Sequence, residues 1–518
     1  MKKLALLLLL MTLTIIATAQ FTKIATSNSF NEPENGYVKI LKTKAGETLF
    51  VHDDKGNVTI KKYSPEKKLI FSKVVKIPFK TQKKLNANSF NSQNSLGYFT
   101  AVFTSGNQLV YIASYLNGRV PTLMRVLIDL DKATIVETKE LGTLDKIGMM
   151  AGTAMMYGNV PLPEFYFKKD PHSDYYATVA FNSFESDRSK RIHVTLYNGS
   201  HEAMSDAYFV SPNEGYKYME LLDLYVDGNN GVYLLASGMN TAASGGNQKG
   251  GLFMGQLKPG NNTINIEQLP IENGGAVYAA LLRYNPVSDK MIMVTNAATS
   301  NKKSNKDTYM QLSTFNKDLS NFQSQDVNIS ALNNIAKTQF KRKESVLAIP
   351  QALYINKDGS YSLVMEEIEI HVFYSTKGSA NKVNYYLKDL GVVKYDKDNK
   401  QVASQYIPKA QRSTYAPSSK FYSFKEDLAY PLIGGTQFKS FSYVNAPSQG
   451  YLLYNDIAAN QEKMQKGKNM TVIQGQGDCE GYYFGNNESG IPKGAKVLRS
   501  EGKDRNLILF AAAYYDEV

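Results

Sequence analysis

The sequence predicts an all-β fold, namely a β-propeller of about seven four-stranded blades with loop insertions. Short apolar segments broken by Gly, Asn, Asp and Pro run through most of the 518 residues, as in strands joined by tight turns. Strongly apolar segments recur along the chain, each followed by a more polar, alternating pair of segments. Amphipathic helical periodicity is scarce, so helices contribute little to the expected core.

Each expected unit opens with a turn and a strongly apolar strand. The turns contain Gly46, Gly106, Gly231 and Gly359, because Gly readily supplies the positive φ that tight hairpin turns need. The centres of the apolar strands lie 57 to 91 residues apart, at Leu49, Leu109, Tyr176, Tyr233, Ile292, Ser362 and Leu453. A compact four-stranded blade needs roughly 40–45 residues, so these units carry inserted loops. We expect the apolar strands in the inner half of each blade, buried by neighbouring blades on both faces.

A half-apolar strand, a polar turn and an amphipathic outer strand complete the unit. Residues 60–73, 126–139, 312–326 and 392–407 show this pattern. A row of separate β-sandwiches is the structural alternative, but it needs linkers rich in Pro, Ser or Gly, and the chain has none of any length. Six or eight blades are the alternatives to seven. The apolar run 506–512 is the natural closing strand, pairing with an N-terminal strand.

The first nineteen residues have the features of a secretory signal peptide. Lys2 and Lys3 precede the apolar residues 4–16, and Ala17-Thr18-Ala19 has the small-x-small form of a cleavage site. The expected organisation is a signal peptide at 1–19 and a single propeller domain at 20–518. No second apolar run reaches about 18 residues, so no transmembrane segment is expected after cleavage. The protein is therefore expected to be exported, as a periplasmic, extracellular or cell-surface associated protein.

Composition restricts the chemistry. The chain has 59 Lys and Arg against 47 Asp and Glu, a net charge of +12, with one Cys and five His. One Cys excludes an internal disulfide framework and a cysteine-based zinc finger, and the five His lack metal-ligand spacing. No cofactor or metal is therefore predicted. Residues 61–84 hold nine Lys and one Glu, which predicts a basic outer face. Such a face is either simply solvated or attracts an acidic polysaccharide or an anionic lipopolysaccharide by weak electrostatics outside the cell. The expected partner is an extracellular ligand, either an acidic glycan or a protein, and not nucleic acid.

One stretch resembles known proteins. Residues 385–396, 407–411, 422–424 and 451–456, with Asn460 after them, are similar to a group of uncharacterised secreted proteins of Bacteroidota that look like propellers and have no assigned activity. The specific similarity covers about 80 residues. The chain departs from that pattern in having no Trp and in placing Gly391 where an aliphatic residue is usual. The resemblance implies the fold and an exported protein, and no chemistry.

Several motifs were weighed as sites. Asp53–Asn57 and Asp227–Gly231 look like calcium loops, but both lack the Glu of an EF-hand and are interpreted as hairpin turns. The methionines at 149, 150, 155 and 156 suit either copper(I) or irregular packing. Glu366, Glu367 and Glu369 suit either glycosidase chemistry or charged outer positions. GxSxG, HExxH and P-loop motifs are absent from the sequence.

The ligand-binding candidates are Asp389, Lys409, Gln411, Asn455 and Asp456, which lie where the resemblance is most specific. Polar residues at strand ends of adjacent blades can converge on one face. The alternative is structural: Asn455 and Asp456 cap a turn, and Lys409 pairs with Asp389. The favoured function is a secreted, non-catalytic binding or interaction propeller whose ligand is a glycan, a peptide or a cell-surface partner. The alternative is an extracellular enzyme acting on polysaccharide with carboxylates in the central funnel. Side chains converging at one mouth of the channel would favour the enzyme.

Overall fold

The structure is a computed structural model. It describes residues 33, 35–79, 99–117, 120–146, 163–211, 216–240, 250–270, 277–298, 308–346, 348–374, 380–413, 430–431, 441–445, 450–474, 479–485, 489–491 and 496–497. The expected signal peptide at 1–19, the methionine cluster and the expected closing strand at 506–512 lie outside the described residues. Within them, no helix is long and apolar enough to cross a membrane.

The first four blades are antiparallel sheets whose strands follow one another in the chain. Blade 1 consists of β1 (Tyr37–Lys42), β2 (Thr48–Asp54), β3 (Asn57–Tyr63) and β4 (Leu69–Lys76). Blade 2 consists of β5 (Phe99–Ser105), β6 (Gln108–Asn117), β7 (Val120–Asp129) and β8 (Thr134–Thr143). Blade 3 consists of β9 (Glu164–Lys169), β10 (Tyr176–Phe181), β11 (Ile192–Tyr197) and β12 (Ala203–Tyr208). Blade 4 consists of β13 (Tyr218–Val226), β14 (Val232–Met239), β15 (Gly250–Leu257) and β16 (Asn265–Leu269).

The last three blades have the same order, with additions. Blade 5 consists of β17 (Val277–Asn285), β18 (Lys290–Ala298), β19 (Thr308–Phe315) and β20 (Gln323–Asp326). Blade 6 consists of β21 (Ala348–Ile355), β22 (Tyr361–Tyr374), β23 (Ala380–Tyr395) and β24 (Gln401–Ile407), with β25 (Gln411–Ser413) paired to β23. Blade 7 consists of β27 (Phe441–Asn445), β28 (Gly450–Asp456), β29 (Glu480–Gly485) and β30 (Lys496–Val497). The helices among the described residues are η1 (Arg188–Lys190), η2 (Gly228–Asn230), α3 (Ser330–Phe340) and α5 (Ala458–Gln465).

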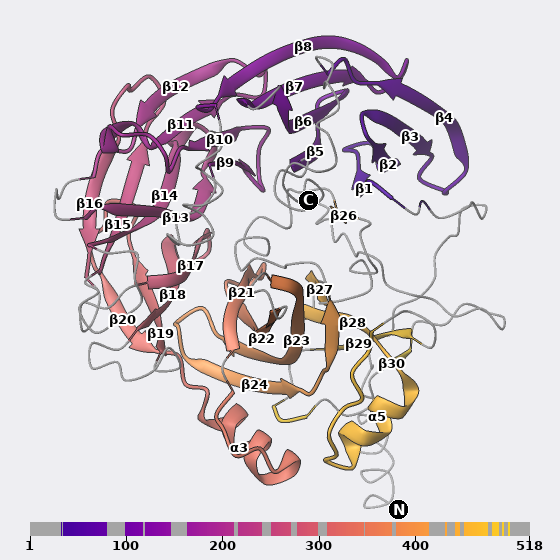
Figure 1. The fold of residues 1–518 in the computed structure, drawn as a ribbon, viewed down its shortest axis with the longest axis vertical. Coiled ribbons are helices and arrows are strands. Elements are labelled where there is room, and N and C mark those ends of the chain that lie inside the picture. The colour runs from indigo at the N-terminus through magenta and orange to yellow at the C-terminus, as the bar shows by residue number, and fades with distance from the viewer. Residues whose placement is uncertain are drawn as a thin grey trace, which may run out of the picture.

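The seven blades form a ring, which confirms the predicted propeller. The first strand of each blade lies nearest the centre of the ring, and the fourth strand lies towards the outer rim (Figure 1). Each of the seven apolar strand centres predicted from sequence falls in the second strand of its blade. The four segments predicted as outer halves coincide with third and fourth strands, as at 60–73 for β3 and β4.

The predicted glycine turns occupy equivalent places. Gly46, Gly106, Gly231 and Gly359 each lie between the first and second strands of a blade, with φ of +80°, +54°, +118° and +80°. At Gly231 a Cβ atom would lie 2.3 Å from the carbonyl oxygen of Leu257, so a side chain there meets backbone. Glycine is therefore required at this turn for both its φ and its size.

Hydrophobic side chains pack between consecutive blades. Six shared clusters join blade 1 to 2, 2 to 3, 3 to 4, 4 to 5, 5 to 6 and 6 to 7. Among the described residues, the remaining faces of blades 1 and 7 carry separate small clusters, around Phe50 and around Leu453. Across the described part of the chain, blades 1 and 7 therefore each share one cluster with a neighbouring blade, whereas each of blades 2 to 6 shares two.

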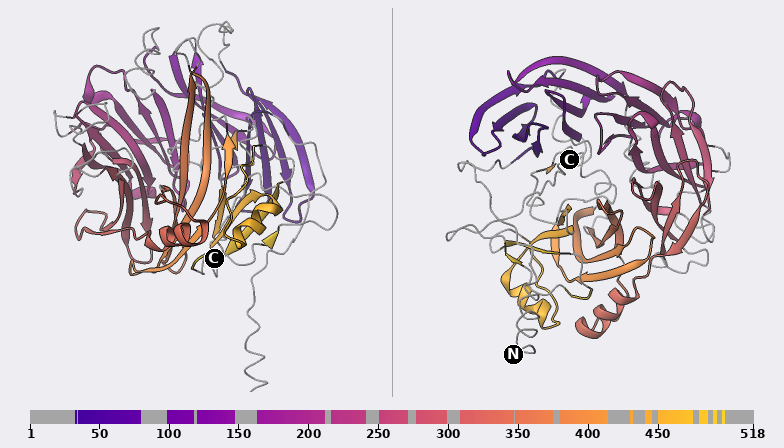
Figure 2. Two further views of the ribbon diagram at one scale, coloured as in Figure 1. Left: turned by 60° about the horizontal axis from the view of Figure 1, so that its bottom comes forward. Right: turned by 180° about the vertical axis from the view of Figure 1, so that it is seen from behind.

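Two features depart from the regular pattern. The two-residue strand β26 (Tyr430–Pro431) pairs with β1 at Tyr37 and Val38, so a segment between blades 6 and 7 reaches the inner edge of blade 1. Strands β22 and β23 have 14 and 16 residues, and in Figure 2 their orange hairpin stands along the height of the ring. A register shift between Glu366 and Ile368 interrupts their ladder, and this irregularity forms part of the site below.

Candidate functional site

The five predicted residues meet at the junction of blades 6 and 7. Asp389 lies in β23, Lys409 and Gln411 follow β24, and Asn455 and Asp456 end β28. Strands β24 and β25 both pair with β23, and Lys409 lies in the break between them. The main-chain N–H of Lys409 donates to Asp389 Oδ1 at 3.1 Å. The predicted convergence of the group is therefore observed.

The ammonium of Lys409 forms a fully buried ion pair. Its Nζ lies 2.5 Å from Glu366 Oε1, and both side chains are 0% exposed. Nζ also donates to Gln411 Oε1 at 3.1 Å and to the carbonyl of Leu387 at 3.4 Å. The amide of Gln411 donates to the carbonyl of Asn455 at 3.0 Å, which links blade 6 to blade 7. The other carboxylate oxygen of Glu366 has no hydrogen-bond partner among the described residues.

Asp389 binds an arginine rather than Lys409. Arg342 Nη1 lies 2.6 Å from Asp389 Oδ2, and the two terminal nitrogens of Arg342 donate to the two carboxylate oxygens of Glu367 at 2.7 Å each. The hydroxyl of Tyr406 donates to Asp389 at 2.5 Å. Burial raises the pKa of Asp389, against these hydrogen bonds, which lower it. The expected Lys409–Asp389 ion pair is therefore wrong, because only the backbone of Lys409 contacts Asp389.

Two features of the backbone bring Arg342, Glu367 and Asp389 together. Helix α3 ends at Phe340, its C-cap residue Lys341 has a left-handed φ of +53°, and the N–H of Arg342 returns to the carbonyl of Ala336 at 3.0 Å. This helix ending directs Arg342 towards blade 6. The irregular pairing between β22 and β23 includes both Glu367 and Asp389, which lie outside the regular register there. Such bulges redirect side chains, and here both carboxylates reach the same guanidinium.

Asp456 anchors the start of α5. Its Oδ1 accepts from Asn460 Nδ2 at 2.8 Å and its Oδ2 from Gln461 Nε2 at 2.6 Å. Asn460 also bonds the backbone of Thr471, accepting its N–H at 2.8 Å and donating to its carbonyl at 3.0 Å. Burial raises the pKa of Asp456 to about 6. The carboxylate at the end of β28 is thus held by two side chains of helix α5, and one of them, Asn460, also secures the segment at Thr471.

The network is closed rather than open. Lys409, Gln411, Asn455 and Asp456 are only 1 to 3% exposed, and the side chains of Lys409, Gln411 and Asp456 bond to other groups of the protein. The ligand-binding role given to the group stays a prediction. Sequence reasoning missed Arg342, Tyr406 and Gln461. Two adjacent glutamates inside the apolar strand 361–370 were the available signal, because buried carboxylates need cationic partners.

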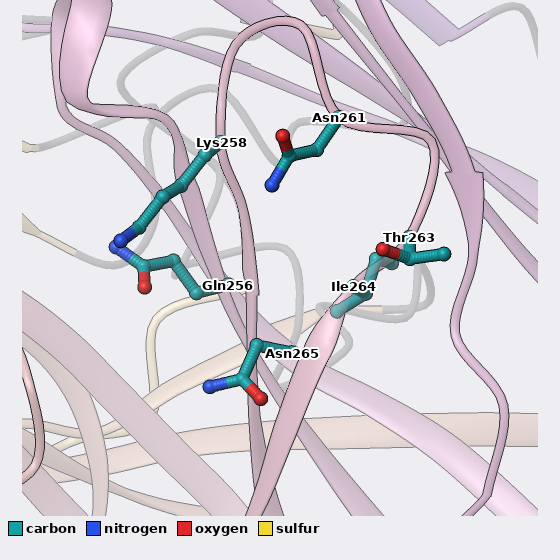
Figure 3. A pocket seen from close by; sticks show the side chains of 6 residues that line it. All are labelled: Gln256, Lys258, Asn261, Thr263, Ile264 and Asn265. Atoms are coloured by element: carbon teal, nitrogen blue, oxygen red, sulfur yellow. The ribbon is translucent and has the colours of Figure 1, made fainter.

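An open pocket lies at blade 4. Its volume is about 310 Å³, and it is lined by Gln256, Lys258, Asn261, Thr263, Ile264 and Asn265. Figure 3 shows these side chains around the turn that joins β15 to β16. Gln256 faces Asn265 across the ladder and donates to the hydroxyl of Tyr233 at 2.7 Å. The lining therefore offers amides, a hydroxyl and one ammonium, and no carboxylate.

Blade 3 holds this pocket in place. Ser205 donates to the carbonyl of Lys258 at 2.8 Å, and the N–H of Gly260 donates to the carbonyl of Met204 at 3.1 Å. These bonds tie the turn between β15 and β16 to the neighbouring blade. The Lys258 side chain is exposed and forms no ion pair with a described residue. An ammonium in this state is available to an anionic ligand.

The other motifs fall into ordinary structural places. Asp53–Asn57 is the turn between β2 and β3, where the Asp53 carboxylate accepts the N–H of Gly56 and the hydroxyl of Tyr111. Asp227–Gly231 is the turn between β13 and β14. Across the described ranges, no group of three or more His, Cys, Asp or Glu is arranged to hold a metal ion.

Comparisons with known proteins add little. No protein-family model and no curated protein matches the chain. Among solved structures, the propeller domain of the Trilobed protease from Pyrococcus furiosus is 7% identical, covering 74% of this chain and 96% of its own, with a TM-score of 0.32. An uncharacterized protein of Listeria monocytogenes is 11% identical, with coverage of 88% and 99% and a TM-score of 0.34. The chain spans about half, 54%, of a prolyl endopeptidase at a TM-score of 0.33. Likenesses this weak give no guide to ligand or activity.

Proposed function

We propose that the protein is a non-catalytic binding propeller that acts outside the cytoplasm, and that the pocket of blade 4 takes an acidic glycan. The observation that carries this proposal is the chemistry of the pocket lining. Amides and a hydroxyl suit the hydroxyl groups of a sugar, and Lys258 suits a carboxylate or sulfate on it. The lining has no carboxylate pair of the kind that glycoside hydrolysis needs.

The arrangement of the buried network supports the same proposal. Glu366, Glu367, Asp389 and Asp456 are engaged with Lys409, Arg342 and amide side chains inside the junction of blades 6 and 7. Carboxylates that serve as acid and base must reach the substrate. Because these carboxylates hold the junction of blades 6 and 7 together, we assign ligand binding to the pocket of blade 4 instead. Export follows from the predicted signal peptide at 1–19.

A calorimetric titration with polygalacturonate tests the proposal, with the fully methyl-esterified polymer as the uncharged comparison. Binding is expected for the acid form, weakened about tenfold or more by Lys258→Ala and by the pair Gln256→Ala and Asn265→Ala. Lys397→Ala is the matched control, because Lys397 is 60% exposed in blade 6, away from the pocket. Equal binding of the ester, or of all the variants, would contradict the proposed site.

Turnover is measured in the same samples. A reducing-end assay is expected to show no increase over hours. An increase that Lys258→Ala leaves unchanged would instead support the enzymatic alternative, with carboxylates elsewhere in the ring.

A further inference from the structure

The outer strand of blade 1 exposes an unusual number of aliphatic side chains. Leu69, Ile70 and Val74 are 51%, 53% and 65% exposed, although all three lie in the eight-residue strand β4. Exposed large apolar residues are ordinary when single and informative when grouped. This group therefore needs an explanation beyond the packing of the ring.

The pairing of β4 with β3 shows on which face of blade 1 these side chains lie. Leu69 pairs with Tyr63 and Val74 pairs with Thr59, whereas the adjacent Val75 is buried in the cluster shared with blade 2. Because neighbouring residues of a strand point to opposite faces, Val74 lies on the face away from blade 2. Tyr63, opposite Leu69, belongs to the small cluster confined to blade 1. The aliphatic residues thus lie outside the six shared cores.

Lysines surround the aliphatic group. Residues 35–79 contain 10 Lys and 4 Asp or Glu, a balance of 10 − 4 = +6 within a chain of net +12. Lys68 and Lys76 are exposed beside the aliphatic residues and form no ion pair with a described residue. We name Lys68, Leu69, Ile70, Val74 and Lys76 the blade 1 patch.

Three of the four acidic groups in residues 35–79 have hydrogen-bond or ion-pair partners within the protein. Glu47 pairs with Lys62 at 3.1 Å, and Asp53 accepts from Gly56 and Tyr111. Glu66 accepts from the hydroxyl of Ser64 at 2.8 Å. Lys62 is itself buried between Glu47 and Asp131, so it does not contribute to the predicted basic outer face. Residues 35–79 as a whole keep the net charge of +6, although Lys68 of the patch interacts electrostatically with Glu66.

We propose that the blade 1 patch docks on an anionic lipid surface. Such a surface offers both phosphate groups and an apolar layer beneath them, which matches lysines around protruding aliphatic side chains. A soluble acidic polymer would satisfy the lysines and leave Leu69, Ile70 and Val74 in water. Blade 1 lies across the ring from the pocket of blade 4, so the docked protein keeps that pocket accessible (Figure 1). The inference is independent of the function proposed for the pocket.

Sedimentation with vesicles tests the inference, using the chain that begins at Gln20 so that the apolar residues 4–16 are absent. Binding to phosphatidylcholine vesicles containing phosphatidylglycerol is expected, with little binding to pure phosphatidylcholine. Lys68→Gln and Lys76→Gln are each expected to weaken partition about fivefold, since one lysine near an anionic surface contributes about that factor. The pair Leu69→Ser and Val74→Ser is expected to weaken it at least tenfold.

The matched control combines Val402→Ser in β24 with Lys400→Gln just before that strand, because Val402 is also 51% exposed and Lys400 is an exposed neighbour. This pair is expected to bind vesicles as the parent does, and circular dichroism verifies that every variant is folded. Equal binding to both vesicle types would overturn the proposal, as would no binding at all. Binding to soluble polyglutamate at equal strength, unaffected by Leu69→Ser and Val74→Ser, would also overturn it in favour of an acidic polymer.

Discussion

Asp456 is a buried carboxyl group whose ionisation opposes folding. Burial raises its pKa to about 6 in the folded protein, above the roughly 3.9 of an unfolded aspartate. Between these two pKa values, the carboxyl group of Asp456 is protonated in the folded state and ionised in the unfolded state. The contribution of Asp456 to the free energy of unfolding therefore rises as the pH falls from 7 towards 4, by up to about 3 kcal/mol.

Asp456→Asn is expected to remove this dependence, because the amide has no proton to gain. The free energy of unfolding in urea, measured from pH 4.5 to 7, gives the comparison. The stability advantage of the parent over the variant should be larger at pH 4.5 than at pH 7. Asp398→Asn is the matched control, since Asp398 is an exposed aspartate, 73% accessible to solvent. Parallel profiles for the parent and Asp456→Asn would contradict the raised pKa.

Lys409 illustrates the difference between having a buried ion pair and breaking one. Lys409→Met leaves the carboxylate of Glu366 buried without its cation, and is expected to cost about 3–5 kcal/mol of unfolding free energy. Adding Glu366→Leu should recover most of that loss, because an apolar pair replaces both charges. Lys397→Met, at an exposed pair, should cost less than about 1 kcal/mol. A double variant no more stable than Lys409→Met would show that the pair itself stabilises the junction.

The candidate site was only partly predictable from sequence. The convergence of Lys409, Gln411 and Asp456 followed from polar residues at strand ends in neighbouring blades, whereas Asp389 lies inside β23 at its irregular pairing with β22. Arg342 could not be assigned to Asp389, because it follows a helix 47 positions earlier and arrives through a left-handed helix ending. The burial of these charged residues could not be predicted either. A sequence does not show whether a charged side chain is exposed to solvent or paired in the interior.

At the scale of single elements, the turn between the first and second strands of each blade can be tested by a matched pair. Gly231→Ala places a Cβ atom 2.3 Å from the carbonyl of Leu257 at a φ of +118°, so a loss of more than about 2 kcal/mol is expected. In Gly106→Ala the added Cβ atom meets no atom within 4 Å. The left-handed φ of +54° is then the only source of strain, so a loss of about 1 kcal/mol of unfolding free energy is expected. Urea denaturation measures both. Equal losses would show that the close contact relaxes without cost.

Some strands, turns and helices could be predicted from residues close together in the sequence, and others could not. Strands and glycine turns were predictable because alternation and positive-φ residues act within a few positions. Helix α5 was not, since its residues Ala458–Gln465 show almost no amphipathic pattern and bury only Asn460 and Met464. Strand β26 was equally hidden, because its two residues are defined only by pairing with β1, nearly 400 positions away.

At the scale of the whole molecule, the ring is a series of sheets that share apolar cores with their neighbours. Blades 2 to 6 share one core on each face, whereas blades 1 and 7 share one each among the described residues. Sequence predicted the number and order of the blades from repetition. It could not predict this inequality, because the amount of shared core depends on contacts between residues distant in the chain.

The unequal sharing predicts where the ring opens first. Local opening exposes the apolar surface between blades, and less of it must be exposed at a blade with one shared core than at a blade with two. Hydrogen exchange followed by mass spectrometry should give the lowest opening free energies for β2 of blade 1 and β28 of blade 7. The highest values are expected for β14 of blade 4, where Leu234 and Leu235 belong to the shared cores on either side. These three strands occupy the same second position in their blades, so each serves as the reference for the others. Protection as strong in β2 and β28 as in β14 would mean that the junction of blades 7 and 1 is as tightly packed as the other six.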